Sequence, residues 1–168
     1  MRKSFNYLIT FITVIMLASC SGQKKVEIKP SLLIGIAEVN YTPEVGLDLV
    51  GNYRGTDYAS RGVHDSLYAR AIVASNPKGE KVAILSIDIC TMTKEPVQMM
   101  RSYIASRTDI KPENVMIHAT HTHSGPRSDL AAPKAKEYLT KAADAVILAN
   151  RNLRPTVLSV GRTKEDRV

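Results

Sequence analysis

The chain has 168 residues, of which 44% are hydrophobic, 23% charged and only 5% aromatic, and its formal net charge at pH 7 is +7. The basic residues are scattered and are not interleaved with aromatic side chains, so the composition excludes a nucleic-acid-binding surface and we expect no nucleic-acid partner. The length suits a single domain with a real core behind a short N-terminal leader.

The first 19 residues have the composition of a bacterial lipoprotein signal peptide. Two basic residues precede a short apolar stretch, and residues 17–20 read Leu-Ala-Ser-Cys, a cleavage site of small residues ending in cysteine. The apolar stretch is too short for a membrane-spanning helix. We therefore expect cleavage before Cys20, lipidation of Cys20, and a polar tether over residues 20–31. This predicts a protein of the bacterial cell envelope, extracytoplasmic and lipid-anchored to a membrane.

Cysteine usage agrees with this leader. The sequence has two cysteines, and once Cys20 carries lipid only Cys90 remains, so no intramolecular disulfide can form. Cys90 closes the apolar run of residues 82–89, and we interpret it as a small buried hydrophobe rather than a nucleophile.

The next part of the chain predicts alternating strands and loops. Leu32–Val39 is a strand, and residues 44–66, rich in Gly, Asp, Tyr and Arg, form a long loop of the kind that is more often functional than idle. Leu67–Ser75 is a second strand. The nearly continuous apolar run Lys81–Ile89 is typical of a fully buried strand.

A βαβ unit follows. Helical spacing of apolar residues predicts a helix over Glu95–Arg107, and a strand carrying the histidines comes after Pro112. Strand, helix and strand over residues 81–124 predict two parallel strands with a right-handed crossover. A second helix over Pro133–Asn150 and a final strand over Thr156–Gly161 complete an α/β fold, a mixed sheet with a βαβ unit flanked by helices.

The most informative segment is residues 115–126, Val-Met-Ile-His-Ala-Thr-His-Thr-His-Ser-Gly-Pro. Because side chains alternate along a strand, we expect His121 and His123 to share one face and His118 to point to the other. Two imidazoles on one face can share a metal, or one can bind the metal while the other handles a proton. Sites in such sheets lie beyond the carboxyl ends of the strands, which places Asp88 on the same rim as these histidines.

Two hydrolase motifs are excluded at this segment. The His-x-His-x-Asp-His motif of metallo-β-lactamases is not met, because Gly125 and Pro126 occupy its Asp and His positions. Ser124 lacks the flanking glycines of a nucleophile elbow, and we interpret it as a turn-forming hydroxyl.

The histidine segment resembles the signature of the neutral/alkaline, non-lysosomal ceramidase family, a Thr-His-Thr-His-Ser-Gly-Pro run that residues 119–126 fit without a departure. Residues 34–43 are similar to that family's opening strand, with Asn40 in place of the usual Asp. Residues 62–64 and 68–71 are similar to its Gly-x-His and Ala-Arg-Ala elements, and the strand that ends in Asp88 is similar to another.

The resemblance implies a zinc-dependent amidohydrolase that cleaves the N-acyl bond of ceramide-like lipids to a sphingoid base and a fatty acid. It implies His121 as a zinc ligand, with His123 beside the metal in contact with the scissile amide or its tetrahedral intermediate. His64, on the Gly-x-His element, lines the site or orders its own loop. Asp88 either orients an imidazole or caps the turn after its strand, and Arg70 is interpreted as structural.

The family's enzymes are much longer and take a second His, a Glu and a Tyr from regions downstream. A catalytic zinc needs about three protein ligands and an open position. We therefore expect residues 32–168 to be the N-terminal portion of a larger catalytic domain, and this chain alone to be inactive or to bind zinc weakly. The alternative is a non-catalytic surface lipoprotein that keeps the family's first domain as a binding module.

Overall fold

The computed structural model describes residues 32–52, 55 and 57–167. The signal peptide, the lipidation site at Cys20 and the tether, all predicted for residues 1–31, lie outside the described residues. Among the residues that are described, no helix is both long enough and apolar enough to cross a membrane.

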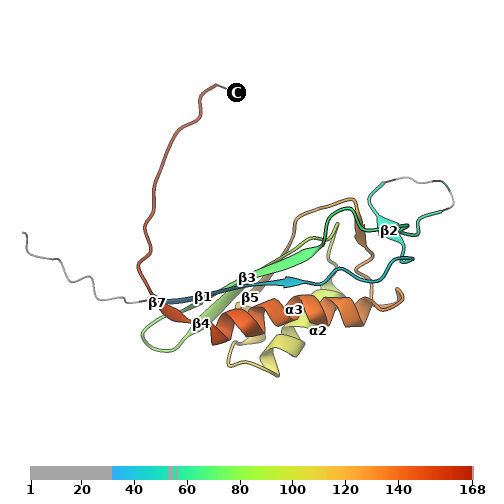
Figure 1. The fold of residues 1–168 in the computed structure, drawn as a ribbon. Helices are drawn as coiled ribbons and strands as arrows, with labels where there is room; N and C mark the ends of the chain where they lie inside the picture. Colours follow the sequence, from blue (N-terminus) through green and yellow to red (C-terminus); the bar gives the residue numbers. More distant parts are fainter. Residues whose placement is uncertain (1–31, 53–54, 56, 168) are drawn as a thin grey trace, which may run out of the picture.

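A five-stranded mixed sheet forms the centre of the fold, with the strand order β5-β4-β3-β1-β7 (Figure 1). Its strands are β1 (Leu32–Asn40), β3 (Tyr68–Ser75), β4 (Lys81–Ile87), β5 (Val115–Ala119) and β7 (Arg154–Thr156). Strand β1 is antiparallel to β3 and β7, and β3 is antiparallel to β4. Strands β4 and β5 are parallel, joined through helix α2, so the predicted mixed sheet and βαβ unit are confirmed.

Two helices, α2 (Lys94–Ala105) and α3 (Ala135–Arg151), lie together on one face of this sheet (Figure 1). Helix α3 contacts β1, β3 and β4, and α2 packs against α3. Gly35 allows this close packing, because a Cβ at that position would lie 1.9 Å from the carbonyl oxygen of Ala149. The backbones of β1 and α3 therefore approach more closely than any side chain on residue 35 would permit.

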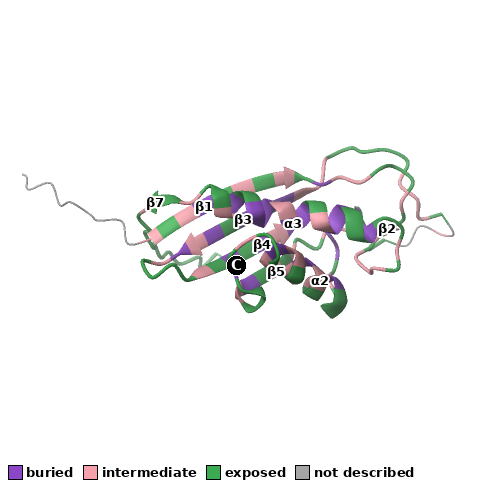
Figure 2. Cartoon of the chain, turned by 90° about the horizontal axis from the view of Figure 1, so that it is seen from below, coloured by how far each residue is buried: buried purple, intermediate pink, exposed green. Residues whose placement is uncertain are grey.

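The core lies between the sheet and the helices. Along β3 and β4 every second residue is buried, which gives the banded strands of Figure 2. The intervening residues point to the helix-free face, where four large apolar side chains lie in register across the sheet and are exposed: Ile36, Ile72, Ile84 and Met116.

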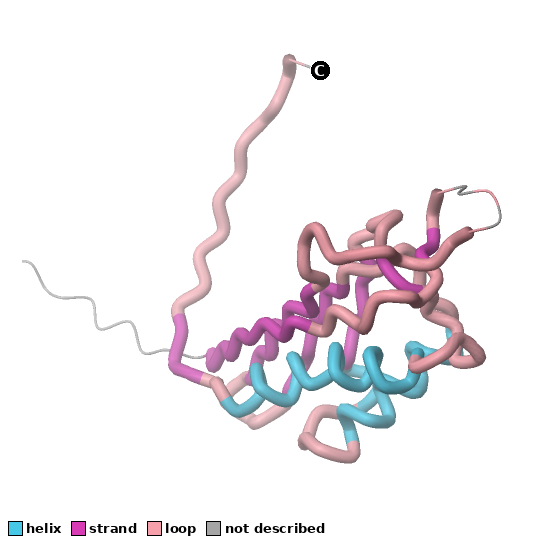
Figure 3. Tube along the Cα trace, turned by 45° about the vertical axis from the view of Figure 1, so that its right-hand side comes forward, coloured by secondary structure: helices cyan, strands magenta, loops and turns pink. Residues whose placement is uncertain are grey.

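A second, two-stranded sheet stands apart from the first (Figure 3). It pairs β2 (Leu49–Val50) with β6 (Gly125–Pro126). These strands were not predicted, since two-residue strands have no detectable periodicity. Their pairing fastens the loop of residues 44–66 to the end of the histidine segment.

Three predicted boundaries are wrong. Strand β5 ends at Ala119, so His121 and His123 lie in the loop after the strand and not on it. Strand β4 ends at Ile87 rather than Ile89. The final strand is Arg154–Thr156 rather than Thr156–Gly161, because the residues directly after α3 pair with the start of β1, and residues 157–167 then leave the sheet (Figure 1).

Candidate metal centre

The loops after the parallel strands β4 and β5 meet at one end of the sheet, as the βαβ unit predicts. The backbone N–H of Thr120 donates to the carbonyl of Ile87 at 2.9 Å, and that of His121 donates to the carbonyl of Ile89 at 3.0 Å. These two bonds hold the loops side by side beyond the ends of the strands. Cys90 and His121 are therefore neighbours although 31 residues separate them.

The backbone of His121 is left-handed, with φ at 64°. This conformation is uncommon for a residue other than glycine and turns the side chain out of the strand's alternation. The ring's Nδ1 lies 2.7 Å from the carbonyl oxygen of Cys90, which can only accept, so Nδ1 is the protonated nitrogen of the neutral ring. The Nε2 atom of His121 is left with a lone pair that can bind a metal.

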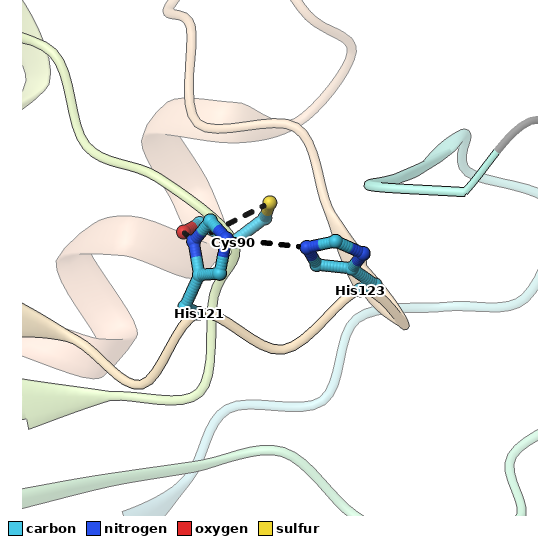
Figure 4. A group of neighbouring side chains, drawn as sticks. All are labelled: Cys90, His121 and His123. Atoms are coloured by element: carbon cyan, nitrogen blue, oxygen red, sulfur yellow. Dashed lines mark hydrogen bonds between the residues drawn. The ribbon is translucent and has the colours of Figure 1, made fainter.

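That Nε2 atom faces the second imidazole. It lies 3.2 Å from Nε2 of His123, and the two ring centroids are 4.9 Å apart at an interplanar angle of 72° (Figure 4). Two nitrogens that share one tetrahedral zinc, each about 2.0–2.1 Å from it, lie about 3.4 Å apart. The spacing therefore suits two ligands of one ion, or one ligand and one group directly beside the ion.

The loop of residues 44–66 supports His123. Gly51, at φ +111°, packs so closely on this ring that a Cβ on it would lie 2.3 Å from the ring's Cγ atom. The Oδ1 atom of Asn52 lies 3.4 Å from Nδ1 of His123, and the Asn52 amide nitrogen lies 3.5 Å from the His123 carbonyl oxygen. Gly51 and Asn52 follow β2, so the unpredicted β2–β6 pairing is what brings them to the histidine.

Cys90 is the third member of the group. It is 6% exposed, as expected for a small buried residue, but its Sγ atom lies 4.0 Å from Nδ1 of His121. One donor atom from each of Cys90, His121 and His123 lies within 4.8 Å of the others (Figure 4). The interpretation of Cys90 as a plain hydrophobe missed this contact. The available signal was its position two residues after Asp88, on the rim where the histidines were expected.

His118 lies apart from this group. It is on β5, exposed on the helix-free face, and its Nδ1 lies 3.4 Å from Oγ of Ser86 on β4. The expectation that His118 faces away from the other two histidines agrees with this geometry. The parity argument itself applies only as far as Ala119, where the strand ends.

His64 and Asp88 line a separate cavity of about 550 Å³. Thr122 and Ser124, which flank His123, also line it, whereas His121 and His123 are not among its lining residues. The Nδ1 atom of His64 is 2.9 Å from the Asp65 carboxylate, and this hydrogen bond raises the pKa of His64 above its ordinary value. The assignment of His64 to the catalytic site stays a prediction.

The contacts of Asp88 anchor the end of β4. Its carboxylate accepts a hydrogen bond from the backbone N–H of Tyr68 at 2.9 Å and lies 3.3 Å from the guanidinium of Arg70. Arg70 also binds the carboxylate of Glu38 at 2.6 Å, in keeping with a structural role. The hydroxyl of Tyr41 donates to the Asp88 carbonyl at 2.6 Å, and burial, followed by the charge of Asp88, raises the pKa of Tyr41.

Comparison of the chain with known proteins identifies its family. Residues 32–164 match the model of the N-terminal domain of neutral/alkaline non-lysosomal ceramidases. The chain belongs to the neutral/alkaline ceramidase family. The predicted resemblance is thus confirmed over nearly all of the described residues.

Individual ceramidases agree. The chain is 30% identical to "Neutral ceramidase 2" of Arabidopsis thaliana over 97 residues, which cover 56% of this chain and 13% of the relative. It is 28% identical to "Neutral ceramidase" of Drosophila pseudoobscura pseudoobscura over 123 residues, 70% of this chain and 16% of the relative. The crystal structure of neutral ceramidase from Pseudomonas aeruginosa superposes with a TM-score of 0.62 at 23% identity, over 77% of this chain and 23% of that one, and confirms the fold. The chain thus spans less than a fifth of the length of these two curated relatives.

The donor set also indicates which metal this ceramidase domain suits. Two imidazoles and a thiol are nitrogen and sulfur ligands, which favour zinc over the oxygen-seeking Mg²⁺ and Ca²⁺. The hydrogen bond from Nδ1 of His121 to a backbone carbonyl is the usual support for a metal-binding imidazole.

Proposed function

We propose that this chain forms the N-terminal part of a zinc-dependent amidohydrolase that cleaves the N-acyl bond of ceramide-like lipids to a sphingoid base and a fatty acid. Its membership of the ceramidase family supports the reaction and the substrate class. The observation that carries the metal assignment is the 3.2 Å approach of the Nε2 atoms of His121 and His123, with Nδ1 of His121 held by a backbone carbonyl.

In this proposal Nε2 of His121 is the atom that would hold the zinc. When bound, zinc supplies Lewis-acid activation of water and of the amide carbonyl. His123 lies close enough to a substrate at that position to hydrogen-bond the scissile amide or its tetrahedral intermediate, and Gly51 and Asn52 keep its ring in place. A ring that is held in place before the substrate binds lowers the entropic cost of aligning the reacting groups.

The proposed location matches the proposed substrate. Lipidation at Cys20 and the tether over residues 20–31 would hold the domain at a membrane of the cell envelope, where an N-acylated amphiphile resides. The leader's charged start, apolar stretch and Leu-Ala-Ser-Cys end support this part of the proposal.

The test is ceramide hydrolysis by the complete enzyme that contains this chain, assayed as fatty acid released. We expect His121→Ala to lower kcat/KM by more than about 100-fold, the upper end of what loss of a second-shell partner costs a metal site. His118→Ala is the matched control, because His118 lies three residues away and outside the group, and it should retain near-normal activity. Equal activity of the two variants would overturn the assignment of His121, and no hydrolysis by the native enzyme would favour the binding-module alternative.

A further inference from the structure

We propose that the helix-free face of the five-stranded sheet is a docking surface, and that its occupant is the polypeptide that follows residue 168 in the complete enzyme. This inference rests on the proposed function, in which the chain is the N-terminal part of a longer enzyme. It begins from the large apolar side chains that are exposed on that face of the described structure.

A row of apolar side chains crosses four strands of the sheet. The pairing of β1, β3, β4 and β5 sets four residues side by side, each between 46% and 65% exposed: Ile36, Ile72, Ile84 and Met116. Val82, which is 53% exposed, extends the patch along β4. A contiguous apolar patch of this kind marks an interaction site, whereas apolar residues scattered singly on a surface do not.

The sequence of β4 suits a strand that is covered on both faces. Ala83, Leu85 and Ile87 are buried beneath the helices, and Val82 and Ile84 point away from them. A strand with one face in water usually carries polar residues on that face, whereas a nearly continuous apolar run belongs to a strand covered on both. Within the described part of the chain, α2 and α3 cover one face, so the pattern calls for a second layer on the other.

A polar row borders the apolar patch on the side of the candidate metal centre. It takes one residue from each of the same four strands, again in register: Glu38, Arg70, Ser86 and His118. Arg70 binds the carboxylate of Glu38 at 2.6 Å. Nδ1 of His118 lies 3.4 Å from Oγ of Ser86. An apolar centre with a polar border is the usual anatomy of a protein–protein interface, and here the border limits the apolar contact to the part of the face away from the metal centre.

The length of the relatives and the course of the chain indicate the occupant. The chain spans less than a fifth of the length of the two curated relatives described above, so the proposed complete enzyme has several times as much polypeptide to place. After β7, residues 157–167 leave the sheet on its helix-free side, opposite the helices (Figure 1, Figure 3). Three apolar residues of this stretch are also exposed: Val157, Leu158 and Val160. The chain therefore continues on the side of the sheet that carries the apolar patch.

A covalently attached segment is favoured over a second copy of the chain. A second copy gives up translational and rotational freedom when it binds, whereas a segment of the same polypeptide is held at a high effective concentration. We therefore assign the face to the downstream polypeptide, and a second copy becomes one outcome of the test.

Methionine oxidation in the complete enzyme measures whether the face is covered. Hydrogen peroxide transfers one oxygen atom to an accessible methionine sulfur, giving the sulfoxide and water, and peptide mass spectrometry follows each site. Met116 reports on the face in the native enzyme, and Ile72→Met adds a reporter at its centre with little change in volume. Leu148→Met is the matched control, because Leu148 is exposed on α3 on the other side of the sheet, and the fully buried Met100 is the slow reference.

In the monomeric complete enzyme, we expect slow oxidation on the helix-free face. Met116 and the methionine of Ile72→Met should react at least about 10-fold more slowly than the methionine of Leu148→Met, because oxidation follows exposure of the sulfur. Their rates should approach that of Met100. Photo-methionine incorporated at residue 116 should, on irradiation, cross-link to a peptide that lies beyond residue 168 of the same molecule.

Fast oxidation at both positions on the face would overturn the docking surface. Protection that is lost on dilution to the monomer, or a cross-link that forms only between two molecules, would assign the face to a second copy and overturn the downstream occupant. A native protein that ends at residue 168 would overturn it as well. Ceramide hydrolysis by an enzyme whose face oxidises fast would keep the proposed function and remove the docking surface, and a protected face in an enzyme without ceramide hydrolysis would do the reverse.

Discussion

The left-handed backbone conformation of His121 itself sets the direction of its side chain. A histidine at φ 64° costs some backbone strain, and here two hydrogen bonds to the segment after β4 hold it. The turn directs the ring toward Cys90 instead of leaving it on the strand's alternating faces. The histidine motif is visible in the sequence, whereas this backbone turn is not, because nothing in Thr-His-Thr specifies a left-handed residue.

Gly51 offers a test of how His123 is held. Gly51→Ala would place a Cβ 2.3 Å from Cγ of His123 and force the ring to move. We expect a loss of ceramide hydrolysis of at least about 10-fold, since a displacement of 1 Å can cost 100-fold. Gly46→Ala is the matched control, because Gly46 has a similar φ of +105° but nothing within 4 Å of its Cβ position. If both variants lost activity equally, backbone strain rather than contact with His123 would be responsible.

His64 should titrate above the ordinary value for histidine. Its hydrogen bond to Asp65, followed by the charge of that carboxylate, raises the pKa, so the ring keeps its proton to higher pH than in the unfolded chain. The ion pair therefore favours the folded state below the unfolded pKa of about 6.5 and loses this effect as the pH rises through the folded value. NMR titration of the ring should show a lower pKa in Asp65→Asn. An identical titration in both proteins would contradict the pairing.

At the scale of elements, the sequence predicts the long helices and strands that have a periodic apolar pattern, and it does not predict the two-residue strands, which have none. The continuous apolar run of β4 and the helical spacing of α2 each extend over seven or more residues, and the extents of both elements were predicted nearly in full. The prediction that β4 is buried on both faces is wrong, because Val82 and Ile84 are exposed on the helix-free face. The β2–β6 pair is two residues long and leaves no such pattern. It is nevertheless the contact that brings Gly51 and Asn52 to His123, so the half of the site built by the long loop could not be derived from local sequence.

Two adjacent residues on β4 lie on opposite faces of the sheet, and their substitution should change the free energy of unfolding by different amounts. Leu85 is 0% exposed under the helices, whereas Ile84, next to it, is 46% exposed on the helix-free face. We expect Leu85→Ala to lower the free energy of unfolding by about 2–5 kcal/mol because it leaves a cavity in the core. Ile84→Ala should cost less than about 1 kcal/mol, mainly in strand propensity. Urea denaturation of both variants measures this, and a smaller loss for Leu85 than for Ile84 would reverse the assignment of the faces.

At the scale of the whole molecule, the candidate site joins segments that are far apart in the chain. Residues 49–52, Cys90 and residues 121–126 meet at one end of the sheet, all within the stretch that matches the ceramidase N-terminal domain. The family could be recognised from short motifs in the right order, whereas the donor set could be seen only after folding. The two histidines could be identified from the sequence, whereas the third member of the group, Cys90, lies after the neighbouring strand β4 and could be identified only in the structure.

The proposed membrane tether concerns residues outside the described part of the chain and can be tested chemically. Expressed in a bacterium that processes lipoproteins, the chain should incorporate labelled palmitate and fractionate with membranes, because the leader ends in a lipoprotein cleavage site. Cys20→Ser should abolish the label, whereas Cys90→Ser should keep it, since Cys90 is buried within the folded domain. Intact-mass measurement should also show loss of residues 1–19 from the native protein. A labelled Cys20→Ser variant, or a native protein that retains these residues without lipid, would remove the tether from the proposal and leave the ceramidase domain without its link to the membrane.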